Sequence, residues 1–198
     1  SCGTNSPKWM GKCGNCGAWN SFVEELIEPK SKTATVVNAP KSKPQLIGAI
    51  SSENRQRFIT SDTELNRVLG GGIVPGSLIL IGGEPGIGKS TLVLQMAINL
   101  KGKKVLYVSG EESVQQIKIR AERIEGTNAD GCFLVSEVSL ERILTHIENT
   151  RPDIVVIDSI QTLETERVES APGSVSQIRE STGMIMRVAK EKNLPVVL

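Results

Sequence analysis

Residues 78–92 read Leu-Ile-Leu-Ile-Gly-Gly-Glu-Pro-Gly-Ile-Gly-Lys-Ser-Thr-Leu, and this stretch decides the fold. The four apolar residues at 78–81 predict an apolar strand. Apolar residues then recur on one face of a following helix: Leu92, Val93, Met96, Ala97 and Leu100. Between strand and helix, residues 83–90 match the pattern Gly-x-x-x-x-Gly-Lys-Ser/Thr. These flanks distinguish a phosphate-binding loop from the alternative, a chance glycine-rich turn.

The spacing within this loop follows from the chemistry of phosphate binding. Glycines allow backbone N–H groups to converge on an anion, and the N-terminus of the next helix adds partial positive charge. In such loops the lysine, here Lys89, contacts the β- and γ-phosphates, and the serine hydroxyl, here Ser90, ligates Mg²⁺. We therefore expect ATP and Mg²⁺ to bind at these residues: Gly83, Glu84, Pro85, Gly86, Ile87, Gly88, Lys89, Ser90 and Thr91.

From about residue 46 onward, apolar strands alternate with amphipathic helices. Further strands are predicted at 105–108, 132–135 and 154–157, and another begins at Pro195. Strands that are apolar on both faces and separated by helices predict a mainly parallel sheet with helices on both sides. The predicted fold class is therefore α/β.

Acidic residues follow two of the predicted strands. An acid at the carboxyl end of a parallel strand faces the ligand crevice, so Asp158 is predicted to hold the water shell of Mg²⁺. Its alternative role is that of a turn residue. Glu111 is predicted to polarise the attacking water. The alternative for Glu111 and Glu112, stabilisation of the next helix N-terminus, suits Glu112 better. The predicted catalytic residues are Glu111, Lys89 and Asp158.

Three of the four cysteines, Cys2, Cys13 and Cys16, lie within the first sixteen residues. A Cys-x-x-Cys-Gly knuckle at 13–17 is typical of a zinc site, which in structural sites has four ligands. A redox role is the alternative, but this pair opens no βαβ unit. Cys132 lies in a predicted strand and is expected to be a small core residue. Such cysteine usage favours a reducing compartment, the cytoplasm.

Length and composition limit the number of domains and the classes of binding partner. The 198 residues suffice for one domain with a small module attached. We predict a zinc-ribbon-like module at 1–27, a linker rich in Pro and Lys at 28–45, and the α/β core at 46–198. With 23 basic and 22 acidic residues, the net charge of +1 excludes a strongly basic nucleic-acid coat. No apolar run is long enough for a membrane span, so no membrane partner is expected.

Four segments together resemble the RadA/Sms family of RecA-like repair and recombination ATPases. They are Leu-Gly-Gly-Gly-Ile at 69–73, residues 82–92, Val-Ser-Gly-Glu-Glu-Ser at 108–113 and Asp-Ser-Ile-Gln-Thr at 158–162. The resemblance covers nearly the whole chain. It implies a RecA-like core that hydrolyses ATP with Mg²⁺, a zinc finger, single-stranded or branched DNA as partner, and branch migration by a hexameric ring. A regulatory ATPase of the KaiC type, acting on protein partners, is the alternative. A third reading is a zinc-ribbon adaptor with a vestigial nucleotide site.

The same resemblance implies parts that these residues do not include. A further zinc-binding Cys is expected three positions before Cys2, and a Lys-Asn-Arg-Phe-Gly motif and a Lon-protease-like domain after Leu198. We therefore expect a piece of a longer protein that binds nucleotide but hydrolyses it slowly by itself. The resemblance also implies a DNA-facing loop at 164–176. Because this loop holds three glutamates and only Arg167 as a cation, a plain surface loop is an equal alternative.

Overall fold

A computed structural model describes residues 2, 11–19, 44–49, 57–124 and 129–198. The chain divides into two compact units, Ser1–Ser51 and Ser52–Leu198. Most of the expected linker, at 28–43, lies outside the described residues, so the boundaries of module and linker stay predictions. Within the described residues, no helix is long and apolar enough to cross a bilayer.

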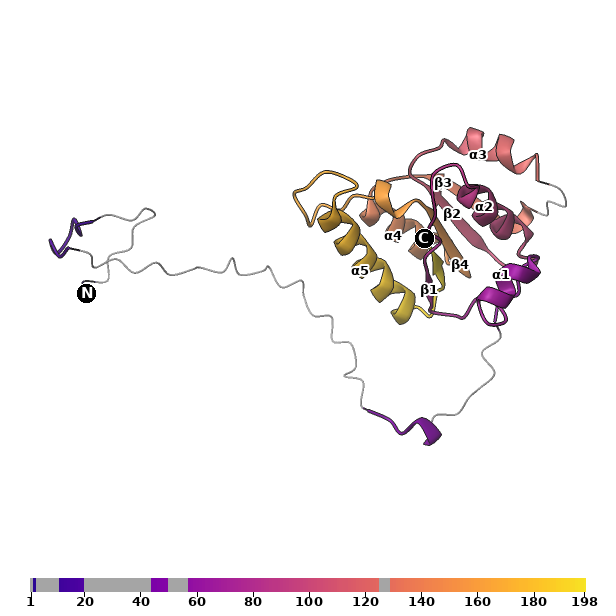
Figure 1. Cartoon of the computed structure of the whole chain (residues 1–198), viewed down its shortest axis with the longest axis horizontal. Helices are drawn as coiled ribbons and strands as arrows, with labels where there is room; N and C mark the ends of the chain where they lie inside the picture. The colour runs from indigo at the N-terminus through magenta and orange to yellow at the C-terminus, as the bar shows by residue number, and fades with distance from the viewer. Residues whose placement is uncertain (1, 3–10, 20–43, 50–56, 125–128) are drawn as a thin grey trace. The chain divides into compact units, whose positions relative to one another are not determined.

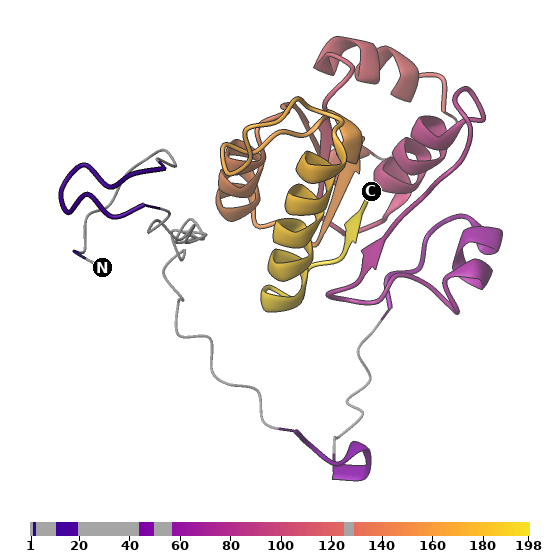
Figure 2. The same ribbon diagram turned by 60° about the vertical axis from the view of Figure 1, so that its left-hand side comes forward.

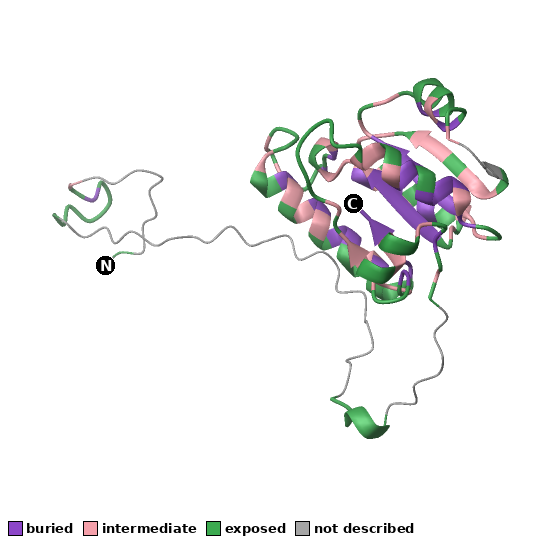
Figure 3. Ribbon diagram, turned by 45° about the vertical axis from the view of Figure 1, so that its right-hand side comes forward, coloured by how far each residue is buried: buried purple, intermediate pink, exposed green. Residues whose placement is uncertain are grey.

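The larger unit is built on a parallel sheet whose five strands follow the spatial order β1-β5-β4-β2-β3 (Figure 1). The strands are β1 (Leu78–Ile79), β2 (Val105–Ser109), β3 (Cys132–Ser136), β4 (Ile154–Asp158) and β5 (Val196–Val197). β2 and β4 are buried along their length, apart from the half-buried Asp158 (Figure 3). The predicted α/β class with a parallel sheet is therefore confirmed.

Helices cover both faces of this sheet (Figures 1 and 2). They are α1 (Thr63–Val68), α2 (Lys89–Asn99), α3 (Val114–Ala121), α4 (Leu140–Thr150) and α5 (Val175–Glu191). The short 3-10 turns η2 (Ala129–Gly131) and η3 (Ile160–Thr162) belong to the same unit, whereas η1 (Ile47–Ala49) belongs to the smaller one. Successive residues of β2 face opposite sides: Tyr107 belongs to the core under α2 and α3, and Val108 to the core under α4 and α5. The two central apolar strands, β2 and β4, are therefore covered on both faces, as the sequence indicated.

The strand predicted at 78–81 is shorter in the structure. β1 comprises only Leu78–Ile79, and the Leu80 side chain is 72% exposed. The reason is the position of β1, which is an end strand of the described sheet and pairs only with β5.

The residues at which the helices begin are set by the local sequence. Ser113, Ser139 and Ser174 each accept a hydrogen bond from a backbone N–H in the first turn of α3, α4 and α5. At α3 the side chain of Gln116 also accepts from the backbone N–H of Ser113, which completes a capping box. These caps fix where each helix begins relative to the strand before it.

Residues 11–19 of the smaller unit form a tight turn. The N–H of Cys13 donates to the carbonyl of Ala18, and the N–H of Gly17 donates to the carbonyl of Cys13, both at 2.9 Å. Gly17 has φ of +72°, a conformation that side chains disfavour, which explains the glycine after the second knuckle cysteine. Lys12 lies over the ring of Trp19, 5.5 Å from its centroid. Trp19 is exposed, and Trp9 lies outside the described residues.

Candidate functional site

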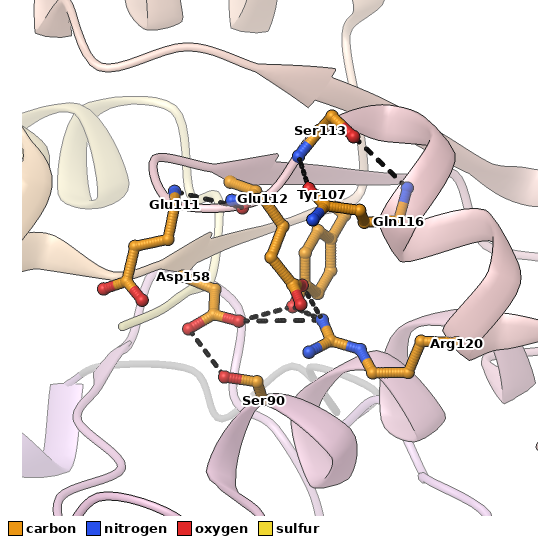
Figure 4. A network of polar contacts seen from close by, with 9 residues as sticks. Ser90, Tyr107, Glu111, Glu112, Ser113, Gln116, Arg120 and Asp158 are labelled. Atoms are coloured by element: carbon orange, nitrogen blue, oxygen red, sulfur yellow. Dashed lines mark hydrogen bonds and ion pairs between the residues drawn. The ribbon is translucent and has the colours of Figure 1, made fainter.

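The carboxyl ends of β2 and β4 and the start of α2 meet at one edge of the sheet. Ser109 at the end of β2 pairs in register with Asp158 at the end of β4. The hydroxyl of Ser90, in the first turn of α2, donates to Asp158 Oδ1 at 3.1 Å (Figure 4). The structure thus brings together the two residues predicted to bind Mg²⁺, which are 68 residues apart in sequence.

The loop at 83–90 has the conformation that an anion cradle requires. Gly86 and Gly88 have φ of +80° and +98°, values that favour glycine. Lys89 Nζ donates to the carbonyl oxygens of Gly83 and Glu84, each at 2.8 Å, so the ammonium group spans the loop. The N-cap of α2 is Gly88, and no side chain caps this helix. The first N–H groups of α2 therefore remain for a bound phosphate.

The donor set at Ser90 and Asp158 fits Mg²⁺. This ion prefers oxygen ligands, keeps several waters and binds through one or two protein groups together with substrate phosphates. One hydroxyl and one carboxylate oxygen 3.1 Å apart, next to the phosphate loop, match that requirement.

Two residues that the sequence analysis did not single out contact Asp158. The hydroxyl of Tyr107 donates to Asp158 Oδ2 at 2.8 Å. Burial, with the Asp158 charge adding to it, raises the pKa of Tyr107 far above its usual range, so the phenol stays a donor at neutral pH. Arg120 Nη2 lies 3.4 Å from the Tyr107 hydroxyl and 4.0 Å from Asp158 Oδ2. A signal existed for Tyr107, because a tyrosine in an otherwise apolar strand needs a partner for its hydroxyl.

The adjacent acids Glu111 and Glu112 have different surroundings (Figure 4). Glu111 is exposed, and its Oε1 accepts a hydrogen bond from the Ser159 hydroxyl at 3.1 Å. Glu112 Oε2 is 2.8 Å from Arg120 Nη2 in a partly buried ion pair. Glu112 directly precedes Ser113, the N-cap of α3, so neither acid lies in the first turn of that helix.

The turn that carries Glu111 packs tightly against η3. The N–H of Gly110 donates to the Asp158 carbonyl at 3.0 Å. A Cβ on Gly110 would overlap the Thr162 hydroxyl and lie 2.7 Å from Thr162 Cβ. Only glycine fits there, and the position of Glu111 is therefore tied to the segment after β4.

The three N-terminal cysteines form a candidate zinc centre. The sulfurs of Cys2, Cys13 and Cys16 all lie within 4.8 Å of one another, and the first two are 3.6 Å apart. Tetrahedral zinc with Zn–S bonds of about 2.3 Å places sulfurs about 3.8 Å apart, so this spacing fits zinc. Cys132, by contrast, lies in β3 of the other unit, and burial raises the pKa of its thiol to about 11, as for an inert core residue.

The loop predicted to face DNA makes several hydrogen bonds to the residue Gln177 of α5. Gln177 is 2% exposed, and its Oε1 accepts from the N–H of Thr165 at 3.0 Å. Its Nε2 lies 3.0 Å from the carbonyl oxygens of both Val168 and Ser170. The glutamates of the loop are exposed, and a DNA contact there stays a prediction.

Comparisons with known proteins agree with this layout. Residues 47–198 match the AAA domain family, and residues 1–24 match the rubredoxin metal binding domain family. The chain is 51% identical to the DNA repair protein RadA of Listeria monocytogenes over 201 residues, and 50% identical to that of Bacillus subtilis over 204. Both alignments cover 100% of this chain and 44% of the relative. The chain thus spans less than half the length of the curated relatives it matches.

Proposed function

The chain belongs to the AAA domain family and resembles the DNA repair protein RadA over its whole length, and we propose that it is the ATP-hydrolysing core of a DNA-repair protein, joined to a zinc module. The observation that carries this proposal is the 3.1 Å contact between Ser90 and Asp158 beside the phosphate loop. Two segments far apart in sequence converge there on one oxygen-rich position.

Each residue then has a defined task at the nucleotide. The backbone of 83–90 and the start of α2 bind the phosphates, and Lys89 supplies positive charge to them. Ser90 and Asp158 would hold Mg²⁺, which when bound neutralises charge on the phosphate oxygens. Glu111, oriented by Ser159, accepts the proton of the attacking water. Glu112 does not compete for this task, because Arg120 engages it.

For the whole protein we propose a DNA-dependent ATPase that drives branch migration as a hexameric ring in the cytoplasm. The support is the similarity to DNA repair proteins together with the metal-binding module at 1–24. The alternative is a regulatory ATPase that acts on protein partners, and it differs in one measurable property. Only the repair motor needs ATP turnover that responds to DNA.

The experiment compares variants of the full-length protein in paired assays of ATP binding and ATP turnover. Lys89→Ala should weaken binding, because it removes the charge facing the phosphates. Glu111→Gln should retain binding and lose about 10²–10⁴-fold in turnover, since an amide cannot act as a base. Glu122→Gln is the matched control, because Glu122 is an exposed acid paired only loosely with Lys118, at 3.4 Å.

Three outcomes would change the proposal. Near-normal hydrolysis by Glu111→Gln would move the base to another acid, with Glu112 tested first. Wild-type turnover that single-stranded DNA does not stimulate would favour the regulatory alternative. Normal ATP binding by Lys89→Ala would contradict the assignment of the phosphate loop itself.

A further inference from the structure

The two carboxylate oxygens of Asp158 have separate partners. Oδ1 accepts from Ser90 at 3.1 Å, on the side of the phosphate loop. Oδ2 accepts from Tyr107 at 2.8 Å, on the side of α3 (Figure 4). A carboxylate held through one oxygen by a fixed donor cannot rotate freely, so the direction of Oδ1 depends on the contact at Oδ2.

Tyr107 is well suited to fix that direction. Its side chain is fully buried, and its ring packs in the apolar core with residues of α2 and α3. In the ladder of β2 and β4, Asp158 pairs with Ser109, two residues beyond Tyr107 on the same face. The tyrosine therefore reaches the carboxylate diagonally across neighbouring strands, from a ring that packing holds in place.

Arg120 connects this contact to the neighbouring acid. From α3, its Nη2 lies 2.8 Å from Glu112 Oε2 and 3.4 Å from the Tyr107 hydroxyl. The guanidinium side chain is 21% exposed, so solvent screens these contacts only in part. One cation thus stands between two carboxylates, those of Glu112 and Asp158.

We propose that Tyr107 and Arg120 are positioning residues of the nucleotide site. Tyr107 holds Asp158 with Oδ1 toward Ser90, and Arg120 supports the Tyr107 hydroxyl and keeps Glu112 on the side of α3. This inference rests on the proposed function, because it concerns how the metal-binding acid is oriented. It also gives a physical reason for the division of labour between Glu111 and Glu112, which sequence alone leaves open.

The first test removes a single hydroxyl. Tyr107→Phe keeps the ring and its packing but loses the donor to Asp158 Oδ2. Loss of such a partner behind a metal ligand typically costs about 10–100-fold in metal affinity. We therefore expect about a tenfold or larger rise in the Mg²⁺ concentration that half-maximally enhances binding of a fluorescent ATP analogue. Binding in EDTA, which reports the phosphate loop alone, should stay within about twofold of wild type.

The second test separates the two contacts of Arg120. Arg120→Met leaves Glu112 without its cation, which should lower thermal stability, because a partly buried charge loses its partner. It also removes the contact to the Tyr107 hydroxyl, so we expect the Mg²⁺ requirement to rise as in Tyr107→Phe. In Arg120→Met/Glu112→Gln that stability should return, since both charges are gone, while the raised Mg²⁺ requirement persists. Arg123→Met, an exposed arginine three residues further along the chain, is the matched control and should change neither property.

The results distinguish this inference from the proposed function. If wild-type protein shows no Mg²⁺-dependent ATP binding, the proposed function fails. If wild type shows it and Tyr107→Phe leaves the Mg²⁺ requirement unchanged, the role of Tyr107 is only structural and the inference is overturned. Full recovery of the Mg²⁺ requirement in the double variant would show that Arg120 acts on Glu112 alone.

Discussion

Replacing Gly110 by Ala should damage the site through a single methyl group. The added Cβ would overlap the Thr162 hydroxyl and approach Thr162 Cβ to 2.7 Å. The backbone φ of Gly110 is not in the left-handed region, so the effect is steric and not conformational. Overpacking of this kind typically costs about 1–3 kcal/mol. For a protein of this size that corresponds to a fall of about 2–12 °C in the unfolding temperature.

Turnover should fall as well, because the Gly110 turn carries Glu111. A displacement of about 1 Å at a catalytic group can cost about 100-fold in rate, and we expect a loss of at least about tenfold. Thermal unfolding of the 198-residue chain, monitored by circular dichroism, measures the first effect. Steady-state ATP turnover of the full-length protein measures the second.

A double-mutant cycle and a second glycine make this prediction specific. Thr162→Gly removes the atoms that the new methyl group would meet, so Gly110→Ala should cost less in that background, by about 1 kcal/mol or more. Gly183→Ala is the matched control, because Gly183 lies within α5 and a Cβ there would meet nothing within 4 Å. It should stabilise the protein by about 0.5–1 kcal/mol. A Gly110→Ala variant with wild-type unfolding temperature and wild-type turnover would refute the packing of this turn against η3.

Two further predictions concern the cysteines. Metal analysis of the full-length protein should find about one zinc per chain. The zinc should be lost in Cys13→Ser and kept in the control Cys132→Ser. Equal zinc content in both variants would contradict the assignment of the zinc centre to the N-terminal cysteines. The pKa of the Cys132 thiol is raised by burial from 9.0 to about 11, so its contribution to stability is complete below about pH 9 and is lost as the pH rises toward 11. Between pH 8 and 10.5, urea titrations should show that the wild type loses about 2 kcal/mol more unfolding free energy than Cys132→Val. Equal losses of unfolding free energy in the two proteins would show that this thiol ionises as freely in the folded state as in the unfolded state.

The sequence by itself determined the features that depend on neighbours along the chain. The phosphate loop at 83–90 was predictable because glycine spacing, a preceding strand and a following helix are all local signals. The strands predicted at 105–108 and 154–157 were recognisable because apolar residues fill them. The zinc knuckle at 13–17 was predictable for the same reason, since two cysteines and a glycine suffice to form its turn.

Tertiary structure alone decided which side chains meet. The strand order β1-β5-β4-β2-β3 differs from chain order, so strands far apart in the sequence become neighbours in the sheet. That order places Tyr107 beside Asp158, 51 residues away, and brings Arg120 between two acids. Glu111 and Glu112 are two adjacent glutamates, and the sequence does not show which side chains each of them contacts. They differ in the fold because successive side chains of a turn point in different directions, one toward Ser159 and one toward α3.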